Sequence, residues 1–163
     1  MGEAVRVEAL VGGASDPETG MSAEMLDADK ILHYWPNIIK MLDEVPHTWE
    51  KNFTKEFFLQ AALHEKMQIW AIGDGSIRLI IFTQIAVFPV ARILEVIWAA
   101  GIGVLDTAGP VVDGALEHFA VSQECSRIDI HGRGGWERIL APWGFKRTSV
   151  ILSRPVDLNR RAH

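Results

Sequence analysis

The hydrophobic period of the chain changes near residue 67, and this change requires a fold that combines helices with a sheet. Between residues 54 and 66 the apolar side chains recur at the spacing of one helix face. From there to residue 100 they alternate as in strands, and Gly73-Asp74-Gly75-Ser76 has the composition of a hairpin turn. The pattern therefore predicts three antiparallel strands, over residues 67–72, 77–87 and 92–100.

Helical patterns precede the three strands. Apolar residues between Ile31 and Leu42 have helical spacing, but a proline inside a helix costs about 3 kcal/mol. Two short helices are therefore predicted there, the second beginning at Pro36. Thr54 is predicted to cap another helix, which ends near Lys66.

A second helical pattern follows the third strand. Asp106 or Thr107 is expected to cap this helix, with Pro110 in its first turn, and the helix runs to about Glu124. The remaining pattern predicts a strand over 127–131, a short helix over 135–143 closed by Gly144, and a final strand over 145–154.

This order of elements defines the fold class as α+β. We expect a single domain with a mixed, mostly antiparallel sheet and helices on both faces. A chain of 163 residues that is 48% hydrophobic is large enough to bury one core. The expected organisation is an N-terminal arm or short strand plus loop over 1–26, the domain over 27–154 and a C-terminal tail over 155–163. Within the first segment, the polar stretch 12–20 is predicted to be a loop.

Charge and cysteine content restrict the partners. The formal net charge is −5, which argues against nucleic acid, because sequence-independent binding to phosphates needs a basic surface. The single Cys125 excludes an internal disulfide framework and is predicted to be a small core residue. No stretch has the roughly 20 apolar residues of a membrane span, and the start of the chain does not resemble a signal peptide.

The element order and the sequence from His131 to Phe145 carry a resemblance to a known family. The chain resembles the GNAT acyltransferase superfamily over residues 27–154. The run Gly-Arg-x-Gly-Trp-x-Arg at 132–138, followed by Gly144 and an aromatic residue, is similar to GNAT-like proteins encoded among the virion genes of tailed bacteriophages.

This resemblance implies a bacteriophage virion or assembly protein that is non-catalytic or weakly active and acts through protein–protein contacts. Its partners would be other virion or assembly proteins, and its location the host cytoplasm during assembly and then the virion. No cofactor is expected in that case. The alternative is an acetyl-CoA-dependent N-acyltransferase.

The resemblance also implies where acyl-CoA would lie. In the family, backbone N–H groups of a Gln/Arg-x-x-Gly-x-Gly/Ala loop at a helix N-terminus hold the pyrophosphate, where an anion is favoured. The counterpart here is Trp98-Ala-Ala-Gly101-Ile-Gly103, with Trp98 in the Gln/Arg place. Gly101, Gly103 and Val104 are the candidate cofactor-binding residues. Asp106 would place a carboxylate near the phosphates.

Proton transfer is the second point at which the chain departs from the family. Many members place a tyrosine four residues before the Gly of Gly-Phe, where this chain has Leu140. Its only tyrosine is Tyr34. Glu95 is the candidate general base, and the other interpretation of Glu95 is a charge at a sheet edge or facing solvent.

Four residues are candidates for contacts with a partner. Arg133, near two glycines, either belongs to an anion site or caps carbonyl groups in a turn. Trp136, Trp35 and Trp49 are candidates because tryptophan is enriched at binding hot spots; the alternative for each is packing within the chain. No metal site is predicted, because the histidines show no ligand spacing.

Overall fold

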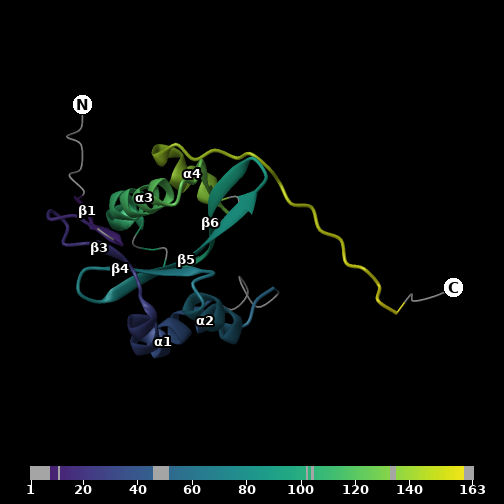
Figure 1. The fold of residues 1–163 in the computed structure, drawn as a ribbon, viewed down its shortest axis with the longest axis horizontal. Coiled ribbons are helices and arrows are strands. Elements are labelled where there is room, and N and C mark those ends of the chain that lie inside the picture. Colours follow the sequence, from purple (N-terminus) through teal and green to yellow (C-terminus); the bar gives the residue numbers. More distant parts are fainter. Residues whose placement is uncertain are drawn as a thin grey trace. The chain divides into compact units, whose positions relative to one another are not determined.

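The computed structural model describes residues 8–10, 12–45, 52–101, 103, 105–132 and 135–159. The chain divides into two compact units, Met1–His131 and Gly132–His163. The described part of the first unit contains a sheet of seven strands and three helices of nine or more residues (Figure 1). Among the helices of the described ranges, none is both long and apolar enough to cross a membrane.

The described elements of the first unit occur in the following order along the chain. They are β1 (Glu8–Leu10), β2 (Gly13–Ser15), β3 (Ser22–Met25), α1 (Ala28–Asp43), α2 (Lys55–Leu63), β4 (Gln68–Gly73), β5 (Ile77–Phe88), β6 (Ala91–Ala100), α3 (Leu105–Ser122) and β7 (Arg127–Ile130). The strands lie in the sheet in sequence order. All neighbours are antiparallel except β6 and β7, which are parallel and joined through α3. The predicted α+β class with a mixed, mostly antiparallel sheet is confirmed.

Helices cover both faces of this sheet. On one face, α1 and α2 enclose an aromatic core in which the ring of Phe58 lies 4.6 Å from that of Phe82 and 6.5 Å from that of Trp98. On the other face, Phe119 of α3 contacts Trp70 of β4 edge to face at 5.4 Å. Figure 1 shows α1 and α2 on the opposite side of β4 and β5 from α3. The core therefore has two layers, with the sheet between them.

Side-chain caps start the first two helices. Asp27 Oδ1 accepts a hydrogen bond from Lys30 N at 2.9 Å, and Thr54 Oγ1 accepts one from Phe57 N at 3.1 Å. The predicted cap at Thr54 is confirmed. The prediction of two helices around Pro36 is wrong, because α1 runs through this proline without a break. Pro36 is exposed, so water can solvate the Leu32 carbonyl that the missing N–H leaves unbonded.

Two further predictions in the first unit are wrong. The stretch 12–20 contains β2, whose pairing with β3 places the buried Ala14 opposite Ala23. Neither Asp106 nor Thr107 caps α3, because the helix already includes Leu105, and Pro110 lies inside it rather than in its first turn. The arm or short strand expected at the start of the chain falls largely outside the described residues, which begin at β1.

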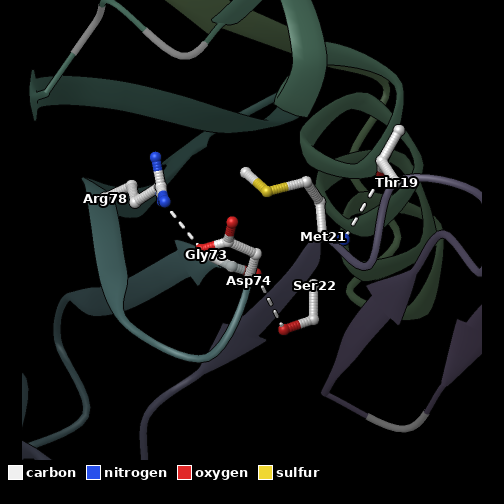
Figure 2. A network of polar contacts seen from close by, with 6 residues as sticks. All are labelled: Thr19, Met21, Ser22, Gly73, Asp74 and Arg78. Carbon is white, nitrogen blue, oxygen red and sulfur yellow. Dashed lines mark hydrogen bonds and ion pairs between the residues drawn. The ribbon is translucent and has the colours of Figure 1, made fainter.

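Polar contacts fix the turn between β4 and β5 (Figure 2). Arg78 pairs with Asp74 at 2.7 Å, and Ser22 Oγ donates to the carbonyl oxygen of Gly73 at 3.5 Å. On the neighbouring loop, Met21 N donates to Thr19 Oγ1 at 3.2 Å. These contacts connect the hairpin turn to β3, the strand that pairs with β4.

The second unit begins at Gly132, and its described residues contain one short helical segment. This segment consists of α4 (Trp136–Leu140) and a 3₁₀ turn, η3 (Ala141–Trp143). Gly144 follows with a φ of 84°, the left-handed conformation that ends helices and favours glycine. The predicted short helix is confirmed. The predicted strand over 145–154 is wrong, because these residues form neither helix nor strand.

Candidate functional site

The parallel strands β6 and β7 part after four paired positions. Their register joins Ile93–Val96 to Arg127–Ile130, and His131 N donates a last hydrogen bond to Val96 O at 3.1 Å. Beyond Val96, β6 continues to Ala100, and in the described part of the chain no strand pairs with it on the β7 side. The carboxyl ends of two parallel strands therefore meet at an opening in the sheet, the usual place for ligands in sheets of this kind.

A β-bulge lies at the same place. Thr83 of β5 pairs with Val96, whereas the adjacent Phe82 pairs with Trp98, so Ile97 has no partner on β5. A bulge adds one residue to a strand, bends it and changes the direction of the side chains beyond it. The bend of β6 thus coincides with the point at which β7 leaves the sheet.

The glycines after β6 have different structural roles. Gly101 has a φ of 94°, and a Cβ there would overlap the carbonyl oxygen of Arg78. Glycine at this position is therefore required by the backbone. Gly103 has open space where a Cβ would lie, with no atom within 4 Å. Val104, the third candidate cofactor-binding residue, lies outside the described residues.

Helix α3 starts directly after this loop. It is 18 residues long, and the N–H groups of its first turn have no acceptor within the helix. These groups and the helix dipole create a positive potential at its N-terminus. Asp106, exposed in the first turn, reduces that potential.

Glu95 lies on β6, one residue before the last paired position. It is half-buried, and its Oε2 accepts a hydrogen bond from Gln84 Nε2 at 2.9 Å. β5 and β7 flank β6, so Glu95 is on an interior strand rather than at a sheet edge. Its role as a general base stays a prediction.

Asp129 was not anticipated as part of this site. The parallel register places it directly beside Glu95, and Arg127 Nε donates to both of its carboxylate oxygens, at 3.0 and 3.2 Å. Gln84, Glu95 and Asp129 therefore form a row across three adjacent strands. No local pattern indicates this row, because it depends on the register of strands that are distant in sequence.

Trp98, in the place where the family has Gln or Arg, belongs to the core. It is 7% exposed, and its ring lies 5.6 Å from that of Phe82. A side chain in this position fills space between the sheet and α2. Any anion at the opening would therefore depend on backbone N–H groups rather than on the side chain of residue 98.

The structure describes two of the four residues that are candidates for contacts with a partner. Trp35 is half-buried and packs against the core between α1, α2 and the sheet. Trp136 lies within the second unit, where its ring occupies the space next to Gly132 that a Cβ would need. Trp49 and Arg133 lie outside the described residues. The contact role of all four stays a prediction.

Among the described residues, the remaining reactive groups form no second site. Leu140 lies in α4, and Tyr34 lies in α1, where its ring contacts that of His33 at 4.8 Å. Burial raises the pKa of the Cys125 thiol, an effect that Arg92 partly offsets. No cluster of three or more His, Cys, Asp or Glu residues suited to a metal ion occurs in the ranges that the structure describes.

Solved acetyltransferase structures share this fold. The aminoglycoside acetyltransferase meta-AAC0020 from an uncultured soil metagenomic sample matches with a TM-score of 0.62 and 10% identity, over 86% of this chain and 99% of its own. Glucosamine-6-phosphate N-acetyltransferase from Arabidopsis thaliana matches with a TM-score of 0.59 and 14% identity, over 84% and 99%. AAC(6')-Iy, in complex with the bisubstrate analog CoA-S-monomethyl-acetylneamine, matches with a TM-score of 0.62 and 10% identity, over 84% and 98%.

These likenesses identify the fold as that of the GNAT acetyltransferases, as the resemblance implied. At 10–14% identity they concern the fold alone. No protein-family model and no curated protein sequence matches the chain.

Proposed function

We propose that the chain is an acyl-CoA-dependent N-acyltransferase whose site is the opening between β6 and β7. One observation carries this proposal: the parallel strands part after Val96, directly before the glycine loop and the N-terminus of α3. The comparison supports it, because the solved structures that share this fold are named as acetyltransferases and one holds a CoA-containing analog.

The loop after β6 has the chemistry to accept a pyrophosphate. The open space at Gly103 allows a phosphate to approach the backbone, and the N–H groups of the first turn of α3, which have no acceptor within the helix, are donors suited to an anion. Asp106 weakens the attraction without blocking these donors, because it is exposed and screened by water. Acyl-CoA is therefore a substrate that the residues present fit.

Glu95 would serve as the general base. An amine attacks the thioester carbonyl, and Glu95 accepts the proton that the nitrogen loses as the new C–N bond forms and the C–S bond breaks. Coenzyme A leaves as a thiolate, which takes a proton from water, because the aliphatic side chain of Leu140 cannot donate one. Gln84 holds the carboxylate of Glu95 in place through its hydrogen bond.

The second candidate is a non-catalytic GNAT-fold protein that acts through protein contacts, such as a bacteriophage virion or assembly protein. Two observations favour it: the missing hydroxyl at Leu140, and the exposed apolar residues 150–152. The names of the solved structures described above refer to acetyltransferases and to no virion component.

Calorimetric titration with acetyl-CoA distinguishes the two candidates. We expect micromolar binding that Gly103→Asp weakens at least about tenfold, because the new carboxylate would face the phosphates. Gly103→Ala is the matched control and should bind normally, because its Cβ meets open space. Release of coenzyme A, measured with a thiol reagent over a panel of amines, then tests transfer. Absence of binding by the unsubstituted chain would favour the non-catalytic candidate.

A further inference from the structure

Arg78, the second residue of β5, borders the loop that follows β6. Ile80 of β5 pairs with Ala100, the last residue of β6. Beyond that pair, Gly101 passes so close to β5 that a Cβ on it would overlap the carbonyl oxygen of Arg78. The backbone of Arg78 therefore lies directly against the start of the glycine loop.

The side chain of Arg78 is held through one of its nitrogen atoms. Arg78 Nε donates to Asp74 Oδ1 at 2.7 Å, beside the turn between β4 and β5 (Figure 2). Within the described residues of the first unit, no other group accepts a hydrogen bond from this guanidinium. Because a guanidinium also carries N–H donors on its Nη atoms, those donors remain for a ligand.

The turn before Arg78 is anchored to the neighbouring strand. The backbone of Ser22 in β3 pairs with Gly73, and Ser22 Oγ donates to the Gly73 carbonyl oxygen at 3.5 Å (Figure 2). A cation on an anchored hairpin loses less conformational freedom on binding than one on a mobile segment does. Arg78 is therefore suited to hold a ligand in a defined place.

The charges around the loop make a cation important for binding a diphosphate. The formal net charge of the chain is −5, and Asp74 and Asp106 place carboxylates on the two segments next to the loop. Arg92 is the second residue of β6 and Arg127 pairs with Ile93, so both begin at the opposite end of β6. The cation that β5 brings to the loop is that of Arg78.

We propose that Arg78 binds the diphosphate of acyl-CoA through its Nη groups, alongside the backbone N–H groups of the loop and of the first turn of α3. This inference rests on the proposed function, because it assigns a further residue to the same site. A planar guanidinium binds phosphate oxygens through paired, parallel hydrogen bonds. Asp74 keeps its bond to Nε and orients the group while the Nη atoms contact the ligand.

Calorimetric titration of the full chain with acetyl-CoA measures the contribution of Arg78. Arg78→Gln should weaken binding at least about tenfold, the effect of losing one hydrogen bond to a charged group. Arg78→Lys keeps the charge but loses the planar donors, so it should recover part of the affinity. Lys66→Gln is the matched control and should bind normally, because this exposed cation precedes the start of β4, whereas the turn beside Arg78 follows its end.

Two further titrations identify the group that Arg78 contacts. The affinity of the unsubstituted chain should fall more steeply with added salt than that of Arg78→Gln, because the variant lacks one pair of opposite charges. Dephospho-CoA lacks the 3′-phosphate and retains the diphosphate, so its binding should depend on Arg78 to the same extent. Circular dichroism checks that the variants are folded, as expected for the loss of an exposed ion pair.

The outcomes distinguish this inference from the proposed function. Equal affinities of the unsubstituted chain and Arg78→Gln for acetyl-CoA would overturn the role of Arg78 and leave the proposed function intact. A dependence on Arg78 that disappears with dephospho-CoA would also overturn it, because the contact would then be to the 3′-phosphate. Absence of binding by the unsubstituted chain would contradict both proposals.

Discussion

Gln84 Nε2 and Glu95 Oε2 lie 2.9 Å apart across β5 and β6, one register position from the bulge that bends β6. A hydrogen bond on an interior pair of strands restricts the carboxylate to one orientation. The candidate base is thus held next to the opening between β6 and β7, rather than left to sample solvent.

This relationship leads to the first prediction. Glu95→Gln should lower kcat/KM of the acyl transfer by about 100-fold, which is the lower end of what a general base contributes. Gln84→Leu should lower it by about 3- to 10-fold through kcat, with the KM for acetyl-CoA unchanged, because Gln84 positions Glu95 and does not reach the cofactor. Steady-state kinetics over a range of pH measures both.

The control for these variants is Gln60→Leu, an exposed glutamine of α2, which should leave the kinetics unchanged. Retention of more than half the activity in Glu95→Gln would remove Glu95 from the mechanism. A change in KM alone for Gln84→Leu would mean that this residue contacts substrate instead.

Two neighbouring glycines should differ sharply in their tolerance of alanine. Gly101→Ala forces a Cβ onto the carbonyl oxygen of Arg78 at a φ of 94°, so we expect a loss of about 2 kcal/mol or more in the free energy of unfolding. In Gly103→Ala the new Cβ lies in open space, so the substitution should change the free energy of unfolding by less than about 0.5 kcal/mol. Urea denaturation compares the two variants, and equal losses would contradict the described path of the loop.

A buried hydrogen-bond chain should contribute measurably to stability. Trp70 Nε1 donates to Thr83 Oγ1 at 3.0 Å, and that hydroxyl donates to Gln68 Oε1 at 2.8 Å. Thr83→Val keeps the shape of the side chain but leaves the buried indole N–H without an acceptor, at a cost of about 1–3 kcal/mol. Thr83→Ser retains the hydroxyl and should cost less. Thermal and denaturant unfolding rank the two variants, and the reverse order would show that the methyl group outweighs the hydroxyl.

Asp113 of α3 makes stability depend on pH. Burial, and then the neighbouring carboxylate of Glu117, raises the pKa of Asp113 above its ordinary 3.8. The folded chain thus binds this proton more tightly than the unfolded chain does. Ionisation of Asp113 therefore costs stability above its raised pKa, and the cost disappears as the pH falls below 3.8.

Asp113→Asn should accordingly stabilise the chain at neutral pH, by less than about 1 kcal/mol because the group is partly solvated. The gain should vanish near pH 3. Glu117→Gln is expected to give a smaller gain in the same direction. Unfolding measured from pH 3 to pH 8 gives the dependence, and a gain from Asp113→Asn that persists at the acidic end would rule out the carboxylate charge as its cause.

Local sequence patterns were sufficient to predict the elements that depend on residues close to one another in the sequence. The helix capped by Thr54 and the turn at Gly73–Ser76 follow from side-chain chemistry within a few residues, and the strands on either side of that turn follow from a period of two. The same reasoning failed at Pro36, because exposure to water and packing of the α1 face outweigh one lost hydrogen bond. It also missed β2 and β3, whose small residues become strands only through pairing, β3 with β4 and β2 with β3.

The candidate site depended on contacts that no window of the sequence contains. Glu95 and the two glycines could be selected from the resemblance to the GNAT family, but Asp129 joins Glu95 only through the parallel register of β6 and β7. The apolar run at 150–152 illustrates the same limit, because a strand exists only where another backbone offers hydrogen bonds to it. Hydrophobic periodicity and helix caps depend on residues that are close in the sequence. Strand register, sheet edges and the opening in the sheet depend on residues that are distant in the sequence and meet only in the folded chain.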